Sequence, residues 1–379
     1  MGLIQENNRL MLLLILTGIF FRPFICALAF PYLNLVYSLV FLICLGVYLI
    51  YKRPVFAKNQ ALVWPLSLFY LALCLSVIFS QDRSNSLALV YQYLNGLGLL
   101  WVAVSLSEKN KLLTIRTLIL AGLAVSLLSL YHYFFGFSHV LDYSSANNLT
   151  SPFILDYLQR KRAFFPFVTP GALGGYLAMI FFLVLACKNR FWPAGLIFTA
   201  LLLTKSLGAF LSLLCALVVY LGVQGKLKKN HFRILAGLLL LLIIMIVWRS
   251  STQKEHLQPV FSALMRINYW QESLAIIKGH PFVGIGLGNF NLPNSRYAHN
   301  AYLQIWAEMG ILGLASFLWM IAVIFRNCLK KLAQLPDKKQ IAGLLAASSV
   351  FLIHNLFDFT FFLPEIALVW WVILGLASL

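Results

Sequence analysis

The chain has 379 residues, of which 61% are hydrophobic and 11% are charged, with a net charge of +18. Soluble domains average about 45–50% apolar and about 25% charged residues, so this composition excludes an ordinary soluble enzyme and a disordered chain. In a soluble protein such a basic balance would suggest nucleic acid. Here the positive-inside rule of membrane proteins explains most of the charge, and no nucleic-acid partner is expected.

Twelve apolar runs fill the sequence and predict an all-α, polytopic membrane protein, because a spanning helix needs about 20 apolar residues. The runs cover residues of about 10–30, 32–51, 60–80, 86–106, 112–136, 166–187, 191–204, 206–223, 232–248, 300–325, 340–357 and 362–378. The run at 191–204 is short for a full crossing. No repeat, linker or soluble domain interrupts the pattern, so residues 1–379 are predicted to form one membrane domain surrounded by lipid.

Lysine and arginine placement predicts the orientation of these helices. With the N-terminus in the cytoplasm, the cytoplasmic loops hold more Lys and Arg than the outer loops, which favours an N-in, C-in topology. The two longest loops, at about 137–165 and 249–299, then lie outside and carry most of the outer cations. Topology does not explain basic outer loops, so these loops are predicted to hold an anion.

The first basic cluster, Arg160 to Arg162, runs directly into a span that opens with two prolines. Arg162 is a candidate phosphate ligand, because the planar guanidinium binds two oxygens. Snorkelling to lipid headgroups is the alternative, and it is favoured for Arg160 and Lys161. Further on, Lys205 stands between two apolar runs with no acid nearby, so it either caps a tight outer turn or faces an anionic cavity.

A second cluster begins at Arg266. If this segment is helical, Arg266, Tyr269 and Trp270 share one face. An arginine beside two aromatic rings suits a sugar phosphate, and an interfacial amphipathic helix is the alternative. The segment Gly284 to Gly288 that follows has GxGxG spacing rather than the GxGxxG of a dinucleotide site. It predicts a close-packed backbone segment that fixes an outer loop.

His299 lies where the second outer loop enters a span, beside basic residues, which makes it a candidate base or acid. Glu308 is about 13 Å further along a helix and on the opposite face, so the two do not form a simple dyad. A carboxylate inside a membrane marks function by default. His354 and Asp358, at i and i+4, are predicted to pair structurally.

Several motifs are absent from the sequence. No DxD, ExD or HExxH motif occurs, no Walker A motif is present, and no nucleophile elbow with a Ser-His-Asp order appears. The acidic residues are spread over the predicted spans without a carboxylate cluster that would suit a divalent cation. We therefore expect neither a metal nor a cofactor.

The ordered set from Arg266 to Gly313 resembles the O-antigen ligase and O-antigen polymerase superfamily of bacterial inner membranes. The matching features are Arg266 with Trp270, the segment PFVGIGLGNF at 281–290, HNAYLQ at 299–304, and then Glu308, Gly310 and Gly313. The hydropathy pattern matches over essentially the whole chain.

Two further segments resemble parts of the same superfamily. Residues 354–358 resemble its C-terminal signature, and Arg162 with Pro170 and Gly171 resembles an earlier Arg and Pro-Asn segment, in which Asn is usual where Gly171 stands. A Ser-Arg-Gly-Ala-like segment of the family reads Ser-Leu-Gly-Ala at 206–209, and Lys205 is the candidate replacement for the missing arginine.

The resemblance implies a GT-C-like membrane glycosyltransferase with a glycan donor linked to undecaprenyl pyrophosphate. It implies metal-independent transfer with inversion on the periplasmic face of the inner membrane. The acceptor is lipid A–core in a ligase and another lipid-linked glycan in a polymerase, whereas some relatives glycosylate pilin. We expect an O-antigen ligase, with a polymerase as the alternative.

Roles in transfer are assigned on this basis. His299 accepts the proton of the acceptor hydroxyl or orients that hydroxyl, while Arg266 and Arg162 hold the pyrophosphate together with Lys205 and Arg296. The outer loop 249–299 closes over the site. Supporting roles fall to four residues: Glu308, Trp270, Tyr269 and Asn300.

A transporter or flippase for a lipid-linked glycan is the rival class. Its ionisable groups should lie near the bilayer midplane, and inverted repeats are frequent in such proteins. Here the candidate residues gather at the outer mouth, and Arg22 and Arg116 are the two cations whose position would favour transport.

Overall fold

The computed structural model describes residues 2–52, 60–146, 157–158, 160–225, 229–250, 259–332 and 338–378. Its α-helices are α1 (Gly2–Phe21), α2 (Pro31–Lys52), α3 (Gln60–Ile78), α4 (Arg83–Ser105), α5 (Glu108–Tyr131), α6 (Phe137–Ala146), α8 (Pro170–Leu185), α9 (Phe191–Thr204), α10 (Leu207–Val223), α11 (Lys229–Ser250), α12 (Pro259–Gly279), α13 (Ala301–Leu332), α14 (Lys339–His354) and α15 (Pro364–Ala377). Short 3-10 turns, η1 (Arg22–Phe24) and η5 (Thr360–Phe362), precede α2 and α15. Within the described ranges no β-strand forms, which confirms the all-α class.

Five segments among the described residues are long and apolar enough to cross a membrane. They are Pro31–Lys52, Ala61–Ile78, Arg83–Ser105, Glu108–Tyr143 and Ala301–Leu332. Seven shorter apolar helices coincide with the remaining predicted runs. The polytopic membrane class is therefore confirmed, while the number of crossings stays a prediction.

Both predicted outer loops contain helices. The run expected to end near residue 136 continues through a π-helical turn (His132–Gly136) into α6, where exposed aromatic side chains such as Phe135 and Tyr143 prolong the apolar surface. The loop expected at 249–299 contains α12. Parts of both loops, residues 147–156 and 251–258, lie outside the described residues.

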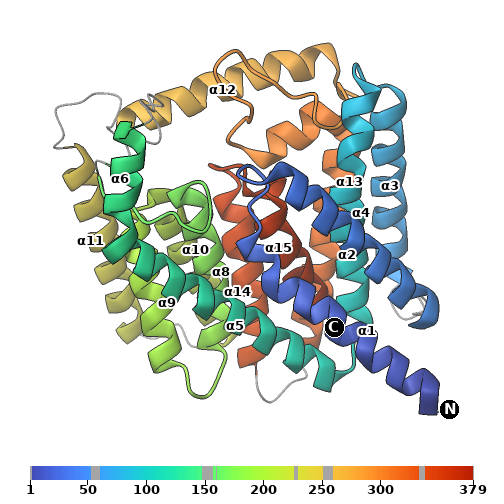
Figure 1. The fold of residues 1–379 in the computed structure, drawn as a ribbon, viewed down its shortest axis with the longest axis horizontal. Coiled ribbons are helices and arrows are strands. Elements are labelled where there is room, and N and C mark those ends of the chain that lie inside the picture. The colour runs from blue at the N-terminus through green and yellow to red at the C-terminus, as the bar shows by residue number, and fades with distance from the viewer. Residues whose placement is uncertain are drawn as a thin grey trace.

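Figure 1 shows most helices side by side in a bundle, with α12 lying across one end of it. We call this the α12 end. Both chain termini lie away from it in this view (Figure 1). Termini on one side of the bundle agree with the predicted N-in, C-in topology, and the side that faces the cytoplasm stays a prediction.

Helices α8, α10, α14 and α15 fill the centre of the bundle, and nearly every described residue of α15 is buried. Small residues allow close approach, as expected where helices pack inside a membrane. A Cβ at Gly375 of α15, for example, would lie 2.6 Å from the carbonyl oxygen of Leu100. Helices such as α2 instead expose apolar side chains, including Val40 and Ile43, which suits contact with lipid.

A buried ion pair ties the beginning of the chain to its end. Arg22 in η1 donates from Nη2 to Asn34 Oδ1 at 2.6 Å, and the same nitrogen lies 3.6 Å from Glu365 Oε2 at the start of α15. Glu365 Oε2 also accepts from the amide of Ala27 at 3.3 Å. Burying an unpaired charge inside a membrane costs free energy. Each side chain lowers this cost for the other by supplying the opposite charge.

Helix α13 is interrupted at Gly310, which has φ 68° and ψ −176°. The segment 281–290 supplies the hydrogen bonds at this break: the amides of Ile285 and Gly286 donate to the carbonyls of Ala307 and Glu308 at 2.8 and 3.1 Å, and the amide of Ile311 donates to Pro281 at 2.9 Å. Buried backbone groups must be paired, so this glycine-rich segment holds α13 in its broken shape. It packs closely, as its spacing predicts.

Replacing Gly310 by alanine is expected to destabilise the protein by about 2–5 kcal/mol, because a side chain at positive φ is strained and the core is overpacked. A Cβ at this position would lie 1.9 Å from the carbonyl oxygen of Phe282. The thermal midpoint in detergent measures the effect. Gly237→Ala in α11 is the matched control, since a Cβ there meets nothing within 4 Å. Equal midpoints for the two variants would contradict the prediction.

Candidate functional site

His299 occupies a constrained position in the loop before α13. Its φ is 50°, a left-handed conformation that is uncommon outside glycine and is frequently found at functional sites. The imidazole stacks on Tyr269 of α12, with ring centroids 5.6 Å apart, and meets Phe359 edge-on at 4.9 Å. Its Nδ1 is buried and has no hydrogen-bond partner among the described residues. The two aromatic rings therefore fix the plane of the histidine.

The surroundings of His299 favour its neutral form. Burial lowers the pKa of this imidazole to about 4, the positive charge of Arg266 lowers it as well, and the charge of Asp358 raises it. At pH 7 the ring is therefore unprotonated, and an unprotonated imidazole can accept a proton.

Arg266 reaches from α12 to the segment between α14 and α15. Its Nε donates to the carbonyl of Phe357 at 2.9 Å, and its Nη1 donates to the carbonyl of Ser262 at 3.2 Å. Within the described part of the chain, Nη2 makes no hydrogen bond to protein. The guanidinium is therefore anchored by two nitrogens, lies near enough to His299 to affect its pKa, and keeps donor capacity for a ligand.

Asp358 lies between His299 and the first turn of α8. His354 Nε2 donates to the carbonyl of Gly171 at 3.0 Å and is 3.8 Å from Asp358 Oδ2, which confirms the predicted pairing. A Cβ at position 171 would lie 2.5 Å from the same carboxylate oxygen. The glycine at this position, where the resembled family usually has asparagine, therefore leaves room for Asp358.

Arg162 and Lys205 form a second basic cluster beside α8 and α10. Arg162 is buried rather than snorkelling, and its Nε donates to the carbonyl of Thr204 at 3.1 Å. Lys205 closes the α9–α10 turn at φ 50°, and its Nζ donates to the carbonyl of Arg160 at 2.8 Å. Burial lowers the pKa of the Lys205 ammonium, and repulsion from the neighbouring Arg162, Lys161 and Arg160 lowers it further. Lys205 thus has the turn role predicted as one of its two alternatives.

The first turn of α8 joins the two basic regions. Gly171 faces Asp358, and Gly174 faces Ser206 and Ala209 at the start of α10. Both helices have N-caps, because Thr169 accepts from the amide of Ala172 at 3.0 Å and Ser206 accepts from the amide of Ala209 at 3.4 Å. Helix N-termini carry partial positive charge, which adds to that of the basic side chains.

The remaining predicted residues have different surroundings. Asn300 caps α13, since its Oδ1 accepts from the amides of Tyr302 and Leu303 at 3.0 and 3.1 Å. Trp270 packs against Phe357, with ring centroids 6.4 Å apart. Arg296 is exposed. Burial raises the pKa of the neighbouring Tyr297 to about 12, and the positive charge of Arg296 opposes this rise. The structure therefore does not bring Arg296 into contact with the other predicted pyrophosphate ligands.

Glu308 is buried in α13 and accepts at Oε1 from Gln304 Nε2 at 2.9 Å. Within the described part of the chain its carboxylate bonds to Gln304 and not to His299, as its place on the helix predicts. Sequence reasoning missed two neighbours of His299: Phe359, which packs on the ring, and Gln304, which binds the preceding loop. Phe359 directly follows the 354–358 segment, and Gln304 lies within 299–304. The two motifs are therefore the sequence signals by which these neighbours of His299 could be found.

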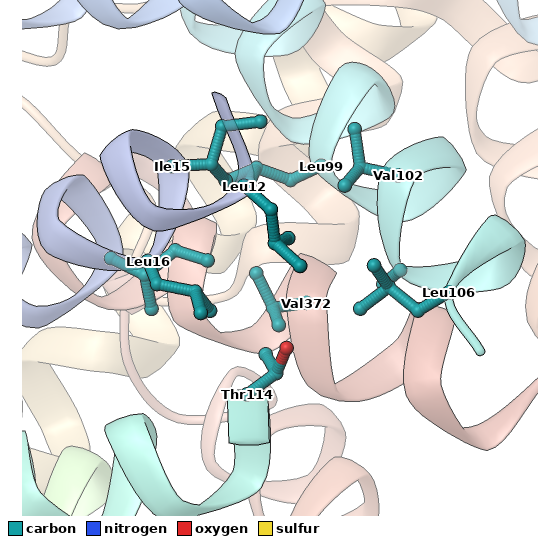
Figure 2. A pocket seen from close by; sticks show the side chains of 10 residues that line it. Leu12, Ile15, Leu16, Leu99, Val102, Leu106, Thr114 and Val372 are labelled. Atoms are coloured by element: carbon teal, nitrogen blue, oxygen red, sulfur yellow. The ribbon is translucent and has the colours of Figure 1, made fainter. Parts of the chain in front are cut away.

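A small apolar cavity lies elsewhere in the bundle, between α1, α4, α5 and α15 (Figure 2). Its volume is about 10 Å³, which is room for about one water molecule. Thr114 supplies the polar atom among the labelled side chains in Figure 2, and none of the candidate site residues lines the cavity. It is therefore not a glycan-binding site.

Fold and site together define a polytopic, all-α membrane protein that brings a neutral histidine, a carboxylate and an anchored arginine together beside α12, with further basic side chains at the α9–α10 turn. Residues 192–318 match the family model described as O-Antigen ligase. The match covers roughly a third of the chain, from α9 into α13, and includes Arg266, His299 and Glu308. It confirms the resemblance to the O-antigen ligase and polymerase superfamily. No curated protein matches the sequence.

This match supports, in general terms, a bacterial membrane enzyme that transfers glycosyl groups and acts on lipid-linked glycans.

Proposed function

We propose that this protein is an O-antigen ligase-type glycosyltransferase of the bacterial inner membrane. It moves a glycan from undecaprenyl pyrophosphate to lipid A–core on the periplasmic face, without a metal and with inversion at the anomeric carbon. The observation that carries the proposal is the family match over the segment in which Arg266 and His299 lie close together.

In the proposed reaction, the oxygen of an acceptor hydroxyl attacks the anomeric carbon from the side opposite to the pyrophosphate. The bond between this carbon and the pyrophosphate oxygen breaks, and the configuration inverts. His299 takes the hydroxyl proton, for which its neutral ring is suited. Undecaprenyl pyrophosphate departs with the bonding electrons as an anion.

The basic side chains stabilise the charge that develops on the leaving group. Arg266 has two nitrogens anchored to backbone carbonyls, so little reorganisation is needed when its remaining donor meets a phosphate oxygen. Arg162 and Lys205, on the other side of the first turn of α8, extend this positive region. The donor's isoprenoid tail lies between spans, so that the pyrophosphate meets both clusters from the membrane.

Localisation follows from the same reasoning. The Lys and Arg distribution favours a cytoplasmic side for both termini, and the termini lie away from the α12 end (Figure 1). The α12 end, with the candidate site, then faces the periplasm, and α12 with the loop that follows it to His299 covers the site.

The positions of the two cations that would favour a transporter, Arg22 and Arg116, argue against that alternative. Arg22 is buried, but Glu365 neutralises it in a 3.6 Å ion pair that joins helices. Arg116 is exposed on α5 rather than directed into the bundle. Neither residue therefore provides a positive path for an anionic lipid through the molecule.

Reconstitution of the purified protein in liposomes tests the proposal. The protein is supplied with undecaprenyl-pyrophosphate-linked glycan and EDTA, with lipid A–core either present or absent. We expect glycan on lipid A–core when that acceptor is added. Growth of the lipid-linked chain without lipid A–core would instead identify a polymerase, and donor movement across the bilayer without any transfer would identify a transporter.

A further inference from the structure

The backbone next to His299 is bound by a buried amide side chain. Gln304, in the first turns of α13, is 3% exposed. Its Oε1 accepts from the amide of Ala298 at 3.2 Å, and its Nε2 donates to Glu308 Oε1 at 2.9 Å. Both ends of one buried side chain are therefore paired, one with the loop and the other with the helix.

The loop at this point needs such a constraint. His299 has a left-handed φ of 50°, which a non-glycine residue adopts only where its surroundings hold it. Ala298 is fully buried immediately before it, and the amide of Ala301 donates to the carbonyl of Asn355 at 2.9 Å shortly after it. Gln304 fixes the side of the loop that leads into His299.

Glu308 determines which way the Gln304 amide is turned. A backbone N–H can only donate, so Gln304 must present its oxygen to Ala298. Its NH2 group must then face an acceptor, and the buried carboxylate of Glu308 provides one. With a donor at position 308, the amide of Gln304 would turn over and place its NH2 against the N–H of Ala298.

We propose that Gln304 and Glu308 are positioning residues for transfer: they form a relay from the interior of α13 to the peptide before His299 and thereby hold the imidazole against Tyr269. The proposal rests on the function proposed above for His299, and it assigns no contact with substrate to either residue. Their effect should therefore appear in kcat rather than in the KM for the donor.

The test exchanges the two side chains. Gln304→Glu replaces the NH2 donor of the 2.9 Å contact with a second carboxyl group, and two adjacent buried carboxyl groups cannot both ionise without repelling each other. We expect kcat to fall at least about 10-fold with little change in KM. Glu308→Gln keeps an acceptor oxygen for Gln304, so its kcat should stay within about threefold of wild type.

In the double variant, the new amide at position 308 donates to the new carboxylate at position 304, whose other oxygen accepts from the amide of Ala298. The kcat of this variant should recover to within about threefold of wild type. These ranges follow from the strength of buried, charge-assisted hydrogen bonds.

Ser316→Ala, in the same helix but outside the site, is the control, since Ser316 bonds only to carbonyls of its own helix in the described residues. Wild-type kcat in Gln304→Glu, or a double variant no more active than that single variant, would overturn the proposal. Hydrogen exchange of the peptide covering 295–300 provides a readout without activity. Gln304→Met should exchange faster there and not in α15, and unchanged exchange would also overturn it.

Different results would contradict the proposed function and the proposed role of Gln304 and Glu308. If the wild-type protein transfers no glycan, the proposed function fails, while hydrogen exchange still tests whether Gln304 holds the loop. If the wild type transfers glycan but the exchanged pair shows no rescue, only the relay fails.

Discussion

Replacing His299 by alanine is expected to lower the rate of glycan transfer by about 10²- to 10⁴-fold, the range for loss of a positioned general base. The ring is held by Tyr269 and Phe359, so no nearby side chain can take its place without repacking. Initial rates of the purified variant in liposomes measure the effect. His280→Ala is the control, because His280 is an exposed histidine of the same predicted outer loop. Full transfer by a normally expressed His299→Ala protein would remove the base assignment.

The pH dependence of the same rate checks the cause. Burial lowers the pKa of His299 to about 4 in the folded protein, so the neutral, active form persists well below the ordinary pKa of about 6.5. The value of kcat/KM, which reports the free enzyme, should stay constant as the pH falls from about 8 to about 5.5. It should then decline with a midpoint near a pH of about 4. A midpoint near the ordinary histidine value would show that the ring is not buried in the free enzyme.

Replacing Arg266 by alanine is expected to lower transfer by about 10²- to 10³-fold, as for loss of one preorganised donor to a developing negative charge. Arg266→Lys keeps the charge but loses the planar fork and its bond to Phe357, so we expect an intermediate rate. Steady-state rates at saturating donor measure both variants. Lys278→Ala, which removes an exposed cation at the end of the same helix, is the control.

Two outcomes would contradict this role for Arg266. A wild-type rate in Arg266→Ala would show that the guanidinium does not touch the leaving group. A lysine variant as active as wild type would show that charge alone matters and that the anchoring to Phe357 and Ser262 has no catalytic value.

The helices could be predicted because their cause is local. A run of apolar residues long enough for a membrane must form a helix that satisfies its own backbone, whatever packs beside it. The break at Gly310 could not be predicted in the same way, since the run 300–325 continues through it without a change in hydropathy. The break depends on the segment 281–290, which supplies the missing hydrogen bonds from outside the helix.

In the candidate site, too, local spacing could be predicted from the sequence, whereas contacts between distant segments could not. Arg266, Tyr269 and Trp270 could be placed on one helix face from spacing, but spacing does not say that Tyr269 stacks on His299 while Trp270 packs against Phe357. The contact between Gly171 and Asp358 joins residues far apart in the sequence. A place for Lys205 in a tight turn is one of its two predicted roles, whereas its left-handed φ could not be predicted. Its replacement of the arginine missing at Leu207 stays a prediction.

The pair formed by Arg22 and Glu365 has a consequence for biogenesis. During synthesis the N-terminal helices emerge first, whereas Glu365 begins the last helix of the described chain. Until the ribosome has made α15, the arginine of the first hairpin lacks the carboxylate that it later meets inside the bundle. The final packing of α1 and α2 must therefore wait until α15 has been synthesised, although both helices precede it in the chain.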